Sequence, residues 1–186
     1  ASKWGRIAGE TQDIYAPIAH RLGLNKTYRE LQDLSFKYTK PWRYQTLTQA
    51  AAKARARAKD LLTTGERALN QAFEHAQIKV SISSREKTLF SIYRKMRTKH
   101  LNFADINDLY GFRVVVDSLS DCYTALGVLH QLYKPVPGRF KDHIAIPKAN
   151  GYQSLHTTLV GPSNVSVEFQ IRTEPMHWVA ESGVAA

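Results

Sequence analysis

The stretch from Leu47 to Gln77 contains no proline and is rich in alanine, lysine, arginine and glutamine, which are strong helix formers. This pattern predicts one long helix and leaves an interruption at Gly65 open. From Ile78 to Ile82 apolar and polar residues alternate, as is typical of a half-buried strand. The change of period predicts a boundary between a helical segment, residues 1–77, and a second domain, residues 78–186.

Helical and strand patterns then alternate along the second domain and end in two adjacent strands. Before the long helix, apolar spacing predicts a helix from Ala8 to Leu24 and another from Tyr28 to Tyr38. After it, the patterns predict helices over 86–99 and 120–133, strands over 112–116, 144–146, 154–160 and 165–171, and a last helix from near residue 174. The expected fold class is therefore α+β, a mixed sheet flanked by helices.

The charge balance favours a polyanionic partner. The formal net charge is +10, which suits nucleotides, RNA or an acidic membrane surface without choosing among them. Cys122 is the single cysteine, so no internal disulfide can form, and we expect it to pack in the core. No apolar run approaches the roughly 20 residues of a membrane span, and no signal-peptide core is present at the start. We expect a cytoplasmic protein with no membrane contact.

Basic residues gather where the first predicted strand gives way to a helix, in the segment 84–87. Backbone N–H groups at a helix start attract anions, and Arg85 and Lys87 add positive charge there. Ser91 and Lys95 follow Lys87 at intervals of four, so one helical face can carry all three toward a phosphate. The alternative is a solvated basic helix face.

Two acids stand out, one at the entrance to a predicted strand and one on a predicted strand. Asp108 precedes an apolar strand, where it could ligate Mg²⁺ or cap a helix, and Arg113 interrupts that strand, where a charge needs a partner. Alternation places Glu168, Gln170 and Arg172 on one strand face, which is also what a solvated strand face would show. A metal site follows only if the fold brings Asp108 across from Glu168.

The loop before the last two strands is the densest cluster. It carries Arg139, Lys141, Lys148 and His156 together with the aromatic ring of Tyr152. A base can stack on the ring while the cations meet its phosphates. The alternative is an ordinary surface connection, although long loops without structure are usually functional.

Taken together and in order, these motifs resemble the RelA/SpoT homologue synthetases. The resemblance runs from about Ile78 to Ala186 and rests on the segments 84–96, 108–113, 139–142, 147–158 and 168–173. Residues 15–24 are similar to the closing helices of that family's hydrolase domain. The resemblance implies a nucleotidyltransferase-like fold of the polymerase-β class.

The resemblance also implies an activity, in which Mg²⁺ assists transfer of the pyrophosphoryl group of ATP to the 3′-hydroxyl of GDP or GTP, with release of AMP. On the donor side it implies adenine contacts from Arg85 and Arg113, phosphate contacts from Lys87, Ser91 and Lys95, and metal ligation by Asp108 and Glu168. Glu168 would also take the proton of the acceptor hydroxyl. On the acceptor side it implies guanine stacking on Tyr152, flanked by Lys148 and Asn150, 5′-phosphate contacts from Lys141 and His156, and support from Gln170.

The sequence departs from the family pattern in several places. Ser84 stands where the family usually has glycine, and Arg139–Asp142 resembles the basic acceptor loop of bifunctional members. The His-Asp pair of the family's hydrolase centre is absent, so we expect this chain not to hydrolyse the 3′-pyrophosphorylated guanine nucleotide, which is called an alarmone. His20 resembles no ligand of that centre. Expected partners are the missing hydrolase and regulatory domains, with ribosome or RNA contact in the full-length protein. The alternative function is a catalytically silent nucleotide- or RNA-binding regulatory fragment.

Overall fold

The computed structural model describes residues 3–106, 109–161 and 165–182, without the side chains of 57–62. The chain forms two compact units, each built from separate stretches. We call them the helical unit (Ala1–Ala56, Lys87–Ile106 and Val179–Ala186) and the sheet unit (Arg57–Glu86 and Asn107–Trp178). The division of the sequence at residue 77 stays a prediction.

The first helical stretch contains a widened turn. Helix α1 (Lys3–Glu10) passes into a π-helix, η1 (Thr11–Tyr15), and then into α2 (Ala16–Arg21), where the sequence predicts one regular helix. Pro17 lacks an N–H group, and its ring clashes with the carbonyl four residues back in a regular helix. A π-turn, whose bonds reach five residues back, relieves that clash.

Aromatic rings join α3 (Asn25–Thr39) to α5 (Leu89–Lys99) inside the helical unit. Phe36 on α3 is 1% exposed. Its ring stacks on Tyr93 at 4.7 Å between centroids and meets Phe90 edge-on at 5.9 Å. Such ring pairs add about 0.5–1.5 kcal/mol beyond the area they bury.

The long predicted helix is confirmed as α4 (Pro41–His75), which continues without a break through Gly65. Proline suits its first position, where the missing N–H costs no hydrogen bond. A Cβ at Gly65 would lie 3.6 Å from the Phe112 ring, an ordinary contact distance. Near the end of α4, Leu69 and Phe73 are buried in the core of the sheet unit.

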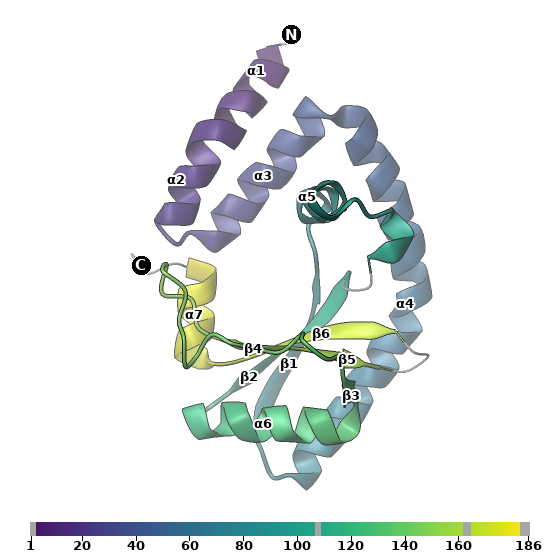
Figure 1. Ribbon diagram of the computed structural model, residues 1–186, viewed down its shortest axis with the longest axis vertical. Helices are drawn as coiled ribbons and strands as arrows, with labels where there is room; N and C mark the ends of the chain where they lie inside the picture. Colours follow the sequence, from purple (N-terminus) through teal and green to yellow (C-terminus); the bar gives the residue numbers. More distant parts are fainter. Residues whose placement is uncertain (1–2, 107–108, 162–164, 183–186) are drawn as a thin grey trace. The chain divides into compact units, whose positions relative to one another are not determined.

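The sheet has the strand order β1-β2-β6-β5-β3, and β4 pairs with β5 (Figure 1). Pairing of β2 with β6 is parallel and every other pairing is antiparallel, so the sheet is mixed and the α+β fold class is confirmed. The strands are β1 (Val80–Glu86), β2 (Tyr110–Val116), β3 (Lys134–Pro135), β4 (Lys141–Asp142), β5 (Leu155–Val160) and β6 (Ser166–Thr173).

One face of the sheet is the core of its unit. Val114, Leu155 and Ile171 are fully buried there, against α6 (Leu119–Leu132) and the last turns of α4. Cys122 on α6 is fully buried in the same cluster, as predicted, and burial raises the pKa of its thiol to about 11. The opposite face is left for polar side chains.

Two local predictions fail. Residues 144–146 form a turn and not a strand, because the Asp142 carboxylate accepts hydrogen bonds from the N–H groups of Ile144 (2.9 Å) and Ala145 (2.8 Å). Strand β1 runs to Glu86, so α5 begins three residues later than expected.

The final helix is confirmed as α7 (Glu174–Ser182). Among the described residues no helix combines the length and the apolar character needed to cross a membrane.

Gly111 permits the central parallel pairing. It lies opposite Glu168, and a Cβ built on it would stand 2.5 Å from the Glu168 carbonyl oxygen. No Cβ atom fits at that distance, so any other residue here forces β2 and β6 apart.

We therefore predict that Gly111→Ala lowers the free energy of unfolding by about 1–3 kcal/mol, the usual cost of overpacking. Gly127→Ala is the matched control, because a Cβ at this position inside α6 meets nothing within 4 Å. The control should raise stability by roughly 0.5–1 kcal/mol, since alanine is the better helix former. Urea unfolding of both variants gives the comparison, and equal stability of Gly111→Ala and wild type would contradict it.

Candidate functional site

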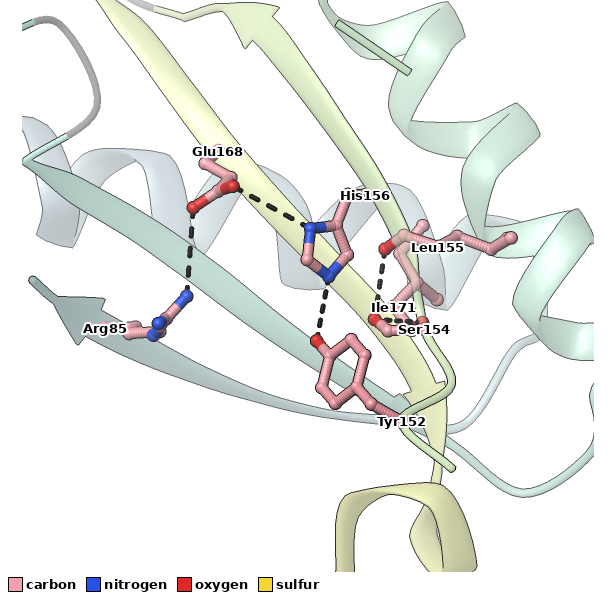
Figure 2. A network of polar contacts seen from close by, with 7 residues as sticks. All are labelled: Arg85, Tyr152, Ser154, Leu155, His156, Glu168 and Ile171. Atoms are coloured by element: carbon pink, nitrogen blue, oxygen red, sulfur yellow. Dashed lines mark hydrogen bonds and ion pairs between the residues drawn. The ribbon is translucent and has the colours of Figure 1, made fainter. Parts of the chain in front are cut away.

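Glu168 lies at the centre of the polar sheet face. Strand register places Arg85, Gly111, Glu168 and Thr158 side by side across β1, β2, β6 and β5. Because Gly111 has no side chain, Arg85 reaches over β2, and its Nη1 lies 3.8 Å from Glu168 Oε2 (Figure 2). Both side chains keep about a quarter of their surface exposed, at 27% and 23%, so the pair stays open to a ligand.

A second row of predicted residues lies two positions further along. Arg113, Gln170, His156 and Lys141 are register neighbours on β2, β6, β5 and β4. Gln170 is 6% exposed and lies between Arg113 and His156. The sheet therefore brings side chains from four strands, far apart in sequence, onto one surface.

His156 links Glu168 to Tyr152. Its Nδ1 lies 3.9 Å from Glu168 Oε1, and its Nε2 lies 2.8 Å from the Tyr152 hydroxyl oxygen (Figure 2). Burial lowers the pKa of His156 to about 3, assisted by the positive charges of His143 and Lys148, so the imidazole is neutral at pH 7. The Nδ1–Glu168 distance is too long for a hydrogen bond, whereas Nε2 and the Tyr152 hydroxyl are joined by one whose donor depends on the tautomer of the ring.

A cation covers one face of the Tyr152 ring. Lys148 Nζ lies 4.8 Å from the ring centroid, a distance typical of a cation–π contact. Burial lowers the pKa of Lys148, and repulsion from Lys141 lowers it further. The Tyr152 ring and the Lys148 ammonium are thus already paired with each other.

The turn before Tyr152 is shaped by its own residues. Gly151 has a φ of +73°, and its N–H donates to the Lys148 carbonyl at 2.9 Å. The Asn150 side-chain oxygen accepts from the Tyr152 N–H at 3.4 Å. In this structure Asn150 therefore holds the turn, which sets the direction of the Tyr152 ring.

Sequence reasoning missed His143 and misjudged Arg172. The His143 ring lies 5.3 Å from that of His156 and 6.2 Å from that of Tyr152. Its signal was its position directly after the 139–142 motif. Arg172 shares the polar strand face, as alternation predicted, but it is 1% exposed, so it belongs to the interior.

The start of α5 differs from the expected open anion site. The Ser91 N–H donates to the Thr88 hydroxyl oxygen at 3.3 Å, and the Phe90 N–H donates to Asp33 Oδ1 at 2.8 Å. These two first-turn donors are therefore already used by the protein. Lys87, Ser91 and Lys95 stay the predicted phosphate contacts near α5.

The described residues supply one carboxylate that suits Mg²⁺. Glu168 is partly exposed, and neither of its oxygens lies within hydrogen-bond distance of Arg85 or His156, so lone pairs remain for a hard cation. Asp108, the predicted second ligand, lies outside the described residues. Within 3–106, 109–161 and 165–182 no group of three or more His, Cys, Asp and Glu could hold a metal ion. One or two carboxylates with substrate phosphates is the usual protein share of a magnesium site.

The fold and its polar face define an α+β protein of the nucleotidyltransferase-like class. A crystal structure of the small alarmone synthetase 2 from Bacillus subtilis matches with a TM-score of 0.55 and 33% identity, over 68% of this chain and 72% of that one. A protein-family profile described as "Region found in RelA / SpoT proteins" matches residues 84–186. The chain belongs to the RelA/SpoT family.

Longer relatives match almost the whole chain. A guanosine-3′,5′-bis(diphosphate) 3′-pyrophosphohydrolase from Vibrio cholerae is 49% identical over 97% of the chain and 26% of its own length. A GTP pyrophosphokinase rsh from Brucella ovis is 48% identical over 97% of the chain and 24% of its own length. The chain spans about a quarter of the length of these curated relatives.

The lowered pKa of His156 predicts a stability that falls in acid. A group whose pKa is lower in the folded than in the unfolded protein binds fewer protons when folded, so protonation favours unfolding. The His156 contribution should be complete above pH 6.5, the ordinary value, and should be lost as the pH falls toward about 3. Urea unfolding between pH 4 and 8 measures this slope, and His156→Gln should flatten it. An unchanged slope would contradict a neutral, buried His156.

Proposed function

We propose that this chain transfers the pyrophosphoryl group of ATP to the 3′-hydroxyl of GDP or GTP, releases AMP, and does not hydrolyse the product. The acceptor oxygen forms a bond to the β-phosphorus of ATP, the bond from that phosphorus to the bridging oxygen of the α-phosphate breaks, and the hydroxyl proton passes to Glu168. Positioning and charge stabilisation supply most of the catalysis in phosphoryl-type transfer. The supporting observation is a partly exposed Glu168 flanked by Arg85 and His156 on a basic sheet face.

The roles of the remaining residues follow from chemistry and from the family resemblance. Guanidinium groups stack on aromatic faces, which suits Arg85 and Arg113 to adenine. The phosphates of ATP would meet Lys87, Ser91 and Lys95. The guanine nucleotide would meet the residues of the second row and the loop, namely Lys141, Lys148, Asn150, Tyr152, His156 and Gln170.

Neutral His156 lies beside the proposed proton acceptor. Its Nδ1 is 3.9 Å from Glu168 Oε1, too far for a hydrogen bond, and an uncharged ring does not neutralise the carboxylate. A carboxylate that keeps its charge can accept a proton from the acceptor hydroxyl. Glu168 and Asp108 would hold Mg²⁺, which supplies positive charge against the phosphates when bound.

Glu168→Gln removes the proton acceptor while it preserves the size of the side chain. We predict that product formation falls at least about 100-fold, the lower range for loss of a general base, with nucleotide binding largely retained. The assay incubates the chain with ATP, GDP or GTP and Mg²⁺ and measures AMP and the 3′-pyrophosphorylated nucleotide.

Glu174→Gln is the matched control, because it makes the same change at an exposed acid directly after β6. It should leave the rate unchanged. If wild type and Glu168→Gln form product equally, Glu168 has another role. A wild-type chain that binds both nucleotides and forms no product supports the regulatory alternative.

Tyr152→Ala tests the acceptor site. Loss of base stacking costs on the order of 1–3 kcal/mol, so binding of GDP should weaken by roughly 5- to 150-fold while ATP binding changes little. Tyr152→Phe keeps the ring and removes only the hydroxyl bonded to His156, so it should retain GDP affinity. Calorimetric titration of each nucleotide separates the cases, and equal losses for GDP and ATP would reject the guanine assignment.

A further inference from the structure

A carboxylate from outside the family-profile match caps the first turn of α5. Asp33 belongs to α3, and the profile begins at residue 84. Asp33 Oδ1 accepts the Phe90 N–H at 2.8 Å. A charged group that accepts helix N-terminal N–H groups is among the stronger protein hydrogen bonds.

One turn further along α3, Phe36 packs against the aromatic rings of α5. It stacks on Tyr93 and meets Phe90 edge-on. Asp33 and Phe36 are three residues apart, so they share one face of α3. The polar contact fixes the start of α5 along its axis, and the ring contacts fix its rotation about that axis.

The rotation of α5 decides where its other residues point. Ser91 and Lys95 are one turn apart and share a face, whereas Phe90 and Tyr93 face α3. A helix that slides or turns on α3 carries Ser91 and Lys95 with it. These two residues and Lys87 are the ones we assign to the phosphates of ATP.

We propose that Asp33 is a positioning residue for the ATP site, so that α3 forms part of the donor-binding machinery although it precedes residues 84–186, which the family profile matches. This inference rests on the proposed function. It assigns Asp33 no contact with substrate. Asp33 acts by holding α5, and through α5 it sets the direction of the phosphate-binding side chains.

Two substitutions separate the hydrogen bond from the charge. Asp33→Ala removes the acceptor and leaves the Phe90 N–H without its partner, whereas Asp33→Asn keeps an acceptor oxygen of the same reach. Burial raises the pKa of Asp33, and the hydrogen bond from the Phe90 N–H opposes that rise. Glu30→Ala, an exposed acid one turn earlier on α3, is the matched control.

The first measurement is amide hydrogen exchange at Phe90, resolved by NMR, which needs no enzyme activity. Asp33→Ala should speed exchange on the order of tenfold or more, the effect expected when a hydrogen bond to a charged group is lost. Asp33→Asn and Glu30→Ala should stay close to wild type. Circular dichroism confirms that each variant is folded.

The second measurement is the Kd for a non-hydrolysable ATP analogue and, separately, for GDP. Asp33→Ala should raise the Kd of the analogue roughly tenfold and leave that of GDP unchanged, and Asp33→Asn should restore the analogue's affinity. A selective loss is not expected from a general loss of stability.

Each result decides a different claim. Unchanged Phe90 exchange in Asp33→Ala, or equal weakening of both nucleotides, overturns the positioning role and leaves the proposed reaction standing. A wild-type chain that binds the ATP analogue but forms no product overturns the reaction, while the selective effect of Asp33→Ala still supports the positioning role.

Discussion

The parallel pairing of β2 with β6 is the contact on which the rest of the sheet unit depends. It opposes Gly111 to Glu168, and the absence of a side chain at Gly111 satisfies two requirements at once. The backbones approach closely enough for regular pairing, and Arg85 can cross β2 to meet Glu168. The buried face of the same strands packs on α4 and α6, so packing on one side fixes the polar arrangement on the other.

Burial determines the charge of His156 on the polar face of the sheet. His156 lies deep enough for burial to hold its pKa at about 3, and the surrounding cations reinforce that effect. Glu168 keeps about a quarter of its surface exposed beside it. Uncharged His156 therefore does not neutralise Glu168, and a partly exposed carboxylate of this kind is suited to accept a proton or a cation.

Periodicity predicted most of the elements because the chain obeys it locally. The long helix, the final antiparallel strands and the alternation that directs Glu168 and Gln170 to one face were visible in the sequence. The turn at 144–146 was not, since Asp142 satisfies backbone donors that a strand would have paired. The residues assigned to the chemistry were identified largely through the family resemblance. Their placement side by side across four strands could be seen only from the strand register of the structure.

Long-range contacts account for what the sequence could not show. No spacing rule links Asp33 to Phe90, and none predicts that a helix start rich in cations already has an internal acceptor.

The proposed function depends most on Glu168 as the group that takes the proton of the acceptor hydroxyl. A crystal structure with a non-hydrolysable ATP analogue, GDP and Mg²⁺ tests it most directly. We expect a Glu168 carboxylate oxygen within about 3 Å of the acceptor 3′-oxygen. A guanine nucleotide bound away from this face, with Glu168 in contact with neither substrate nor metal, would contradict it.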